Sequence, residues 1–128
     1  MEQINSKQDL INYFEKGCKK ENQLSVGVEH EKFIFDNPTN QRVNFETVSK
    51  IFDFLEQFGW KPIKEKDYVI GLSREGQSIT LEPGNQIELS GAKLNSVHLN
   101  CSESYKYLDE LRKACKKLNL KMMSVSFD

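Results

Sequence analysis

Three short segments of this chain alternate between apolar and polar residues, and this pattern constrains the fold more than any other feature. Successive side chains of a β-strand point to opposite faces, so each segment predicts a strand with one apolar face and one polar face. The polar face carries carboxylates in all three segments. The alternating residues are Val26, Val28, Glu29 and Glu31 in 24–35, Ile79, Thr80, Leu81 and Glu82 in 78–82, and Gln86, Ile87, Glu88, Leu89 and Ser90 in 86–90.

Three helices and two further strands are predicted around these segments. Apolar residues at i, i+3, i+4 and i+7 indicate an amphipathic helix, and the clearest case is Val48, Ile51, Phe52 and Leu55, with Asn44 as the capping residue before them. Helices are expected at 7–16, between 44 and 59, and at 94–118, and further strands at 68–73 and around Met123, Val125 and Phe127. The predicted fold class is α+β, an antiparallel sheet with flanking helices.

The length and charge of the chain narrow the class of protein. With 128 residues it has the size of one ordinary domain, and 18 Lys and Arg against 19 Asp and Glu give a net charge of −1. Nucleic-acid binding depends on clustered Lys and Arg, so this balance argues against a nucleic-acid partner. The sequence has no apolar run long enough to span a membrane and no secretory signal pattern, and we expect a cytoplasmic protein.

The cysteines predict neither a disulfide framework nor a zinc site. Cys18, Cys101 and Cys115 are odd in number and have no C-x-x-C spacing. Cys101 and Cys115 lie on the apolar stripe of the predicted third helix, and we expect both to be small buried hydrophobic residues. The two histidines, His30 and His98, lie on different elements and have no second ligand at metal spacing.

The carboxylates of the predicted sheet allow two interpretations from spacing alone. If the first strand pairs in register, Glu29, Glu31, Glu82 and Glu88 crowd one surface, and the tight turn brings Glu82 within reach of Glu88. Like charges at cross-strand distance are destabilising unless a cation neutralises them, and Mg²⁺ prefers carboxylate oxygens together with phosphates. The more common alternative is an exposed strand face on which glutamates simply face water.

Two segments carry a resemblance to a known family. Gly27–Phe33 (GVEHEKF) and Ser78–Ala92 (SITLEPGNQIELSGA) resemble the two N-terminal signatures of glutamate–cysteine ligases of the plant and proteobacterial type. The resemblance extends over nearly the whole chain from about residue 24. It implies a glutamine-synthetase-like (carboxylate–amine ligase) catalytic fold. The implied activity is the ATP-dependent joining of the glutamate γ-carboxylate to the cysteine amine through a γ-glutamyl phosphate, the first step of glutathione biosynthesis.

The resemblance also implies roles for residues and small molecules. It makes Glu29, Glu31, Glu82 and Glu88 the expected Mg²⁺ ligands, with ATP, glutamate and cysteine as substrates. Because the last apolar alternation stops at the chain end, we expect residues 1–128 to be the N-terminal part of a single catalytic domain, truncated within the fold and inactive alone.

Two departures from the family pattern bear on these expectations. Asn85 replaces the usual second glycine of the turn, and Asn tolerates positive φ well enough to keep the turn. Ile34 stands where glycine is common; if that glycine lets a ligand approach the backbone, Ile34 would narrow the site and weaken the expectation about substrate choice. Two alternative functions stay open, namely another carboxylate–amine ligase of the same fold and a non-catalytic binding module.

Overall fold

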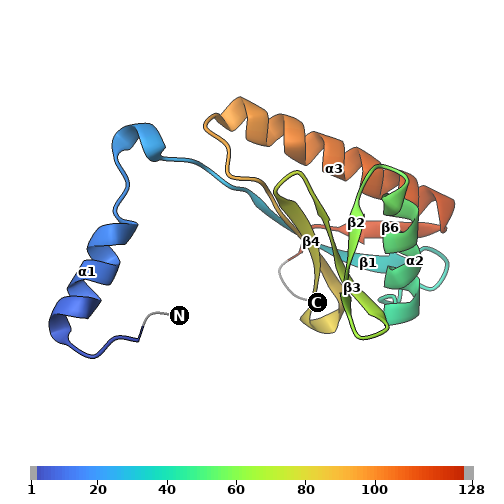
Figure 1. Ribbon diagram of the computed structural model, residues 1–128. Coiled ribbons are helices and arrows are strands. Elements are labelled where there is room, and N and C mark those ends of the chain that lie inside the picture. Colours follow the sequence, from blue (N-terminus) through green and yellow to red (C-terminus); the bar gives the residue numbers. More distant parts are fainter. Residues whose placement is uncertain (1–2, 126–128) are drawn as a thin grey trace.

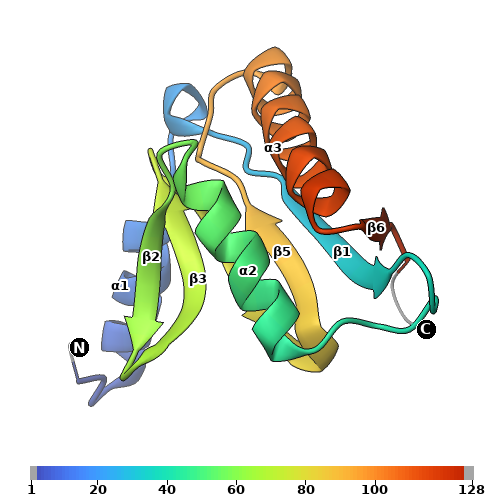
Figure 2. The same cartoon turned by 90° about the vertical axis from the view of Figure 1, so that its right-hand side faces the viewer.

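A computed structural model describes residues 3–125 of the chain, and its centre is a six-stranded antiparallel sheet with the strand order β2-β3-β4-β5-β1-β6 (Figures 1 and 2). The strands are β1 (Glu29–Asp36), β2 (Lys61–Glu65), β3 (Tyr68–Arg74), β4 (Gln77–Glu82), β5 (Gln86–Ser90) and β6 (Leu120–Met123). The helices are α1 (Lys7–Gly17), α2 (Phe45–Glu56) and α3 (Val97–Lys117). The predicted α+β class with an antiparallel sheet and flanking helices is confirmed.

Helices α2 and α3 lie on the same side of the sheet and cover its apolar face (Figure 2). Asn44 accepts a hydrogen bond from the Thr47 backbone N–H and starts α2, as predicted. The apolar stripe of α2 is fully buried against the sheet. The core of the molecule lies between these helices and the strands, and its largest members include Phe52, Ile79, Ile87, Leu89, Tyr107 and Leu111.

The β3-β4-β5 meander forms as the alternation predicts. Glu75 and Gly76 make the first turn with φ angles of 48° and 83°, and Pro83–Asn85 makes the second as a short 3-10 turn. Asn85 has a φ of 60°, so it adopts the positive φ expected of it, and its side-chain amide donates to the Val43 carbonyl oxygen at 3.0 Å. The substitution of asparagine for glycine therefore leaves this turn intact.

Several predicted boundaries are wrong. The first strand begins at Glu29 rather than residue 24, because Val26 makes only an isolated bridge with Leu94. Strand β2 was not expected, since its sequence KPIKE has no apolar alternation and all its residues are exposed. Of the predicted last strand, β6 reaches Met123, whereas Phe127 lies outside the described residues.

The predicted apolar stripe of α3 is wrong in its first half. Val97 is 64% exposed and Cys101 is also exposed, whereas Asn100 and Ser104 are buried. The side-chain Nδ2 of buried Asn100 donates to the Val26 and Ser96 carbonyl oxygens at 3.3 and 3.1 Å, which offsets part of the cost of burying this amide. Cys115 is buried as expected, and burial raises the pKa of its thiol to about 11.

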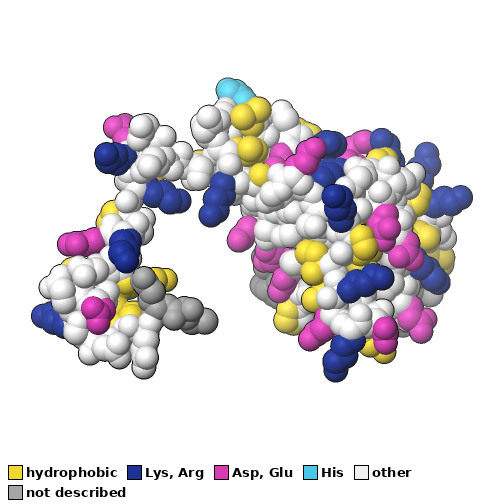
Figure 3. All heavy atoms as spheres, in the orientation of Figure 1, with side chains coloured by type: hydrophobic (Ala, Val, Ile, Leu, Met, Phe, Trp, Pro, Cys, Tyr) yellow, Lys and Arg dark blue, Asp and Glu magenta, His cyan; other side chains and the backbone are white. Residues whose placement is uncertain are grey.

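Helix α1 stands apart from the sheet and helices (Figure 1). Ser6 caps it as predicted by accepting from the Asp9 backbone N–H at 3.1 Å. None of its residues is buried, and its apolar residues Leu10, Ile11 and Phe14 are exposed. Acidic and basic side chains are interspersed over the visible face of the molecule (Figure 3). No helix in residues 3–125 has the length and apolar character needed to cross a membrane.

Candidate functional site

The candidate site is the polar face of the sheet, opposite α2 and α3, where β1, β5 and β4 lie side by side. In the β1–β5 pair Glu31 lies directly opposite Glu88, and Glu29 lies opposite Ser90. In the β5–β4 pair Glu88 lies opposite Thr80. Residues directly opposite on antiparallel strands share a face. The register therefore places all four predicted carboxylates on one face, as the alternation indicates.

Glu82 and Glu88 lie on neighbouring strands and the same face, but they are diagonal neighbours and not direct cross-strand partners. Glu82 lies opposite Gln86, and the pairing of Thr80 with Glu88 leaves Glu82 two residues further along its strand. The tight turn at 83–85 fixes this register, because it makes the strand-end residues 82 and 86 direct partners. The direct carboxylate neighbour of Glu88 is instead Glu31, across the β1–β5 pair.

Polar neighbours orient three of the four carboxylates. Gln86 donates from Nε2 to Glu31 Oε2 at 2.9 Å. The Thr80 hydroxyl donates to Glu82 at 3.0 Å, and the Ser90 hydroxyl donates to Glu88 at 3.0 Å. The alternation already predicts that Gln86 and Ser90 share a face with Glu88. That they donate hydrogen bonds to the carboxylates could not be predicted, because it depends on how the strands pair. Glu29 and Glu31 are exposed, whereas Glu82 and Glu88 are partly buried.

The like charges of Glu31 and Glu88 are not neutralised by ion pairs within the described chain. The two ion pairs of residues 3–125 are Arg74–Glu110 and Lys113–Asp109, and neither involves the sheet carboxylates. Across the same residues, no three His, Cys, Asp or Glu side chains gather closely enough to hold a metal ion. The paired carboxylates nevertheless fit Mg²⁺, because this ion is usually held by one or two carboxylates together with phosphates and water.

A cavity of about 500 Å³ adjoins the carboxylates at one end of this face. Glu29 and Ser90 line it together with Gly91 and two cations, Lys19 and Lys93. A carboxylate beside two ammonium groups gives this hollow donors and acceptors for a zwitterionic or anionic small molecule.

Gly91 is needed for the packing beside this cavity. A Cβ atom at this position would lie 2.4 Å from Glu103 Oε1 and 3.0 Å from the Val28 carbonyl oxygen. Glu103 Oε1 accepts a hydrogen bond from the Ala92 backbone N–H at 3.1 Å. The Glu103 side chain of α3 thus holds the backbone just after β5 in place. Gly91, a residue of the second motif, leaves room for this side chain.

Gly91→Ala is expected to lower the free energy of unfolding by about 1–3 kcal/mol, because the new methyl group displaces Glu103 or the Val28 backbone. Urea denaturation of the chain measures this change. Gly17→Ala is the matched control, since its Cβ would meet no atom within 4 Å. A Gly91→Ala variant as stable as the control would contradict the proposed packing.

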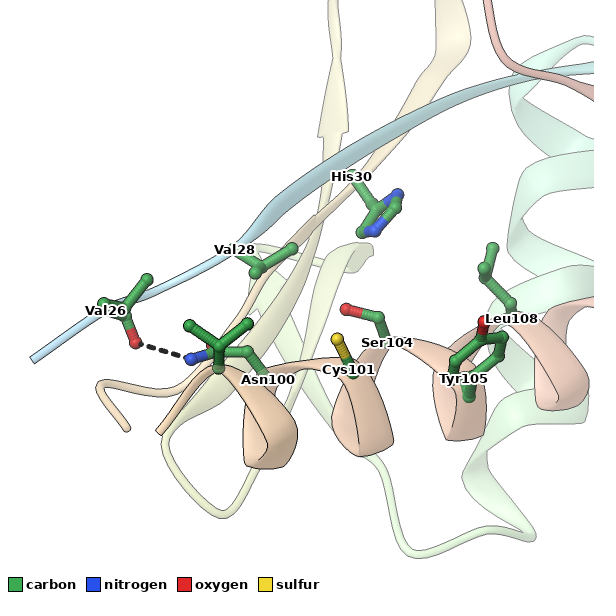
Figure 4. A pocket seen from close by; sticks show the side chains of 9 residues that line it. Val26, Val28, His30, Asn100, Cys101, Ser104, Tyr105 and Leu108 are labelled. Atoms are coloured by element: carbon green, nitrogen blue, oxygen red, sulfur yellow. Dashed lines mark hydrogen bonds between the residues drawn. The ribbon is translucent and has the colours of Figure 1, made fainter. Parts of the chain in front are cut away.

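His30 and Lys32 alternate with Glu29 and Glu31 along β1 and therefore lie on the helix side of the sheet, away from the carboxylates. His30 lines an apolar cavity of about 360 Å³ between β1 and α3, with Cys101 and Tyr105 on the opposite wall (Figure 4). Burial lowers the pKa of His30, and the nearby Lys32 ammonium lowers it further. Burial also lowers the pKa of Lys32, and Glu31 opposes this shift. His30 is therefore neutral at pH 7 and does not contribute to the carboxylate face.

Ile34 does not narrow the site. It is 1% exposed and belongs to the hydrophobic core. Side chains alternate between the two faces along β1, so Ile34 lies on the helix side together with His30 and Lys32. Glu29 and Glu31 lie on the opposite face. The pleat turns its side chain into the core, so the condition under which Ile34 would weaken the expectation about substrate choice is not met.

Comparisons with known proteins agree with the motifs. The family model described as glutamate-cysteine ligase family 2 matches residues 25–128. The chain is 37% identical over 123 residues to the chloroplastic glutamate–cysteine ligase of Medicago truncatula and 34% identical over 123 residues to that of Arabidopsis thaliana. Each match covers 95% of this chain and 24% of the relative. The chain thus spans about a quarter of the length of these relatives.

The names of these relatives contradict one expectation. The ligases of Medicago truncatula, Nicotiana tabacum and Arabidopsis thaliana are all named chloroplastic, so the expected cytoplasmic location is not supported. That expectation came from the missing secretory signal, which says nothing about other compartments. The match of the family model to four-fifths of the sequence, together with both signature segments on adjacent strands, shows that this chain belongs to glutamate-cysteine ligase family 2.

Proposed function

We propose that this chain supplies part of the catalytic site of an ATP-dependent ligase that joins the γ-carboxylate of glutamate to the amine of cysteine. The observation that carries the proposal is the cross-strand pair of Glu31 and Glu88 on the open face of an antiparallel sheet, in a member of this family. The fold proposed for the whole enzyme is the carboxylate–amine ligase fold. Its sheet would present these carboxylates to the nucleotide.

The four carboxylates are the proposed magnesium ligands. Glu31 and Glu88 lie opposite each other, and Glu29 and Glu82 lie further along the same face. These carboxylates would hold a divalent cation, which would neutralise charge on the nucleotide phosphates during phosphoryl transfer. It would also reduce the repulsion between the two facing glutamates, neither of which takes part in an ion pair of residues 3–125.

The polar neighbours of the carboxylates have a positioning role in this proposal. Gln86, Thr80 and Ser90 each donate to one carboxylate oxygen and leave the other oxygen free of described partners. A carboxylate with one oxygen fixed in this way has a restricted orientation, so less conformational freedom is lost when a cation binds. The carboxylates would then be held ready for the metal rather than ordered by it.

The proposed division of the protein follows from the length of the relatives. Residues 1–128 are proposed to be an N-terminal portion of one catalytic domain, since the matches cover 24% of the relatives. The activation of glutamate as a γ-glutamyl phosphate, and its attack by the cysteine amine, would then require residues from the rest of such a domain. We expect the 128-residue chain to form no γ-glutamylcysteine by itself.

A hybrid enzyme tests the proposed function. The chain would replace the matching 123 residues of the Medicago truncatula ligase, and product formation would be measured with ATP, Mg²⁺, glutamate and a panel of amines. We expect ATP-dependent synthesis with cysteine preferred over the other amines. Preference for a different amine would instead support another carboxylate–amine ligase. A folded hybrid that turns over no amine would contradict the proposed catalytic role.

A further inference from the structure

A second polar cavity, of about 690 Å³, lies beside the turn that joins β3 and β4. Three positively charged side chains from three different elements line it, namely Lys61 of β2, Arg74 of β3 and Lys106 of α3. Residues that are far apart in the sequence therefore bring positive charge to one hollow. None of these three residues lies in either family motif.

The strand register builds one wall of the cavity. Lys61 lies opposite Ser73 in the β2–β3 pair, and Ser73 lies opposite Ser78 in the β3–β4 pair. These three residues form a row on the polar face of the sheet, and the row continues through Ser90 to Glu29. An ammonium group and two hydroxyl groups thus line the cavity from the sheet.

Arg74 adds a buried positive charge to the lining of the same cavity. Its side chain is 6% exposed and lies over the Trp60 ring at 4.1 Å. Nη1 donates to the Phe58 carbonyl oxygen at 2.9 Å and to Glu110 Oε1 at 2.8 Å, whereas Nε and Nη2 have no hydrogen-bond partner. The guanidinium is thus held in place by Phe58 and Glu110 while the residue forms part of the cavity wall.

The charge balance of the cavity favours an anion. Glu110 compensates the charge of Arg74, and Glu75 is the acidic residue among those lining the cavity. Lys61 and Lys106 take part in neither ion pair of residues 3–125, so the lining keeps a net positive charge. An oxyanion with several acceptor oxygens can bind ammonium, hydroxyl and guanidinium donors together.

We propose that this cavity binds the phosphate group of a small molecule, held by Lys61 and Lys106 with Ser73 and Ser78 as further donors. The site needs no metal ion and shares no residue with the carboxylate set. It is therefore separate from the proposed magnesium site, although its residues Lys61, Ser73 and Ser78 lie in the same cross-strand row as Glu29.

The test is a titration of the 128-residue chain with pyrophosphate in EDTA at constant ionic strength, followed by backbone amide NMR shifts. We expect saturable shifts at Gly76, Gln77 and Ser78. The double variant Lys61→Gln and Lys106→Gln is expected to raise the Kd by about tenfold or more, because two charge-assisted hydrogen bonds are lost. Both lysines are exposed, so the variant keeps its fold, which the amide spectrum verifies.

Matched controls separate a site from general attraction. Lys64→Gln with Lys117→Gln makes the same charge change on the same two elements outside the cavity, and its Kd should stay unchanged. Equal weakening by both double variants, or shifts that do not saturate, would overturn the proposal. Glutarate binding as tightly as pyrophosphate would overturn the assignment to phosphate. The Glu31→Gln and Glu88→Gln variant should keep its pyrophosphate affinity. A failure of the proposed magnesium site can therefore be distinguished from a failure of the proposed phosphate site.

Discussion

Replacing Glu31 and Glu88 together by glutamine is expected to raise the Kd of the chain for Mg²⁺ by about 100-fold or more. Replacement of groups that only support metal ligands already costs about 10- to 100-fold in affinity, and this change removes two charged ligands themselves. Calorimetric titration of the chain with Mg²⁺ measures the effect. In the hybrid enzyme the same variant should lose ATP-dependent product formation.

Although this variant should bind Mg²⁺ more weakly, its free energy of unfolding without metal should be higher than that of the parent chain. Glu31 and Glu88 face each other across β1 and β5, and like charges in this arrangement destabilise a sheet by a few tenths of a kcal/mol to about 1 kcal/mol. The double variant should therefore unfold at a slightly higher urea concentration than the parent chain in EDTA. Added Mg²⁺ should stabilise the parent chain but not the variant, because only a bound ligand shifts the unfolding equilibrium.

The control for this pair removes two glutamates from the other side of the molecule. Glu46→Gln with Glu56→Gln changes the net charge equally, and both residues are exposed on α2. This variant should bind Mg²⁺ like the parent chain. Unchanged Mg²⁺ affinity in the Glu31→Gln and Glu88→Gln variant would show that the sheet carboxylates face water, which is the simpler of the two interpretations.

Glu110→Gln is expected to lower the free energy of unfolding by about 3–5 kcal/mol, because it leaves the buried Arg74 charge without its counter-ion. Glu110 is 4% exposed, and it accepts from Arg74 Nη1 and from Trp60 Nε1, each at 2.8 Å. This carboxylate connects α3 to the start of β2 and to the end of β3. Urea denaturation followed by Trp60 fluorescence measures the loss.

A surface ion pair on the same helix gives the matched comparison. Asp109 accepts from Lys113 at 2.6 Å, with both side chains more than half exposed. Exposed pairs of this kind contribute about 0–1 kcal/mol, so Asp109→Asn should change stability by no more than this. Similar effects of Asp109→Asn and Glu110→Gln would show that the buried network does not stabilise the fold.

Local patterns predicted those parts of the fold in which a segment's own residues decide its conformation. Helix α2 follows from its apolar spacing and from Asn44, and the β3-β4-β5 meander follows from alternation and turn residues. The same alternation assigned Glu29, Glu31, Glu82 and Glu88 to one face. It could do so because the pleat has a period of two, which does not depend on the partner strand.

Contacts between distant segments explain the parts that were not predicted. Asn100, Ser104 and Glu110 interrupt the apolar stripe of α3, yet they are buried. Each of Asn100 and Glu110 has a hydrogen-bond partner at least thirty-six positions away, Val26 for Asn100 and Arg74 for Glu110. Strand β2 forms only because β3 offers it an edge, since its own residues are exposed and include Pro62. The residue pattern of one segment cannot predict partners that come from a distant segment.

The sequence alone determined that this protein has a two-faced antiparallel sheet with helices, and that its carboxylates share one face. Only the tertiary structure decided that Glu31 faces Glu88, that Glu82 faces Gln86, and that Ile34 lies in the core. The physical reason is the range of the interactions. Side-chain alternation is a property of each strand, whereas strand register and the convergence of Lys61, Arg74 and Lys106 arise only when separate segments pack together.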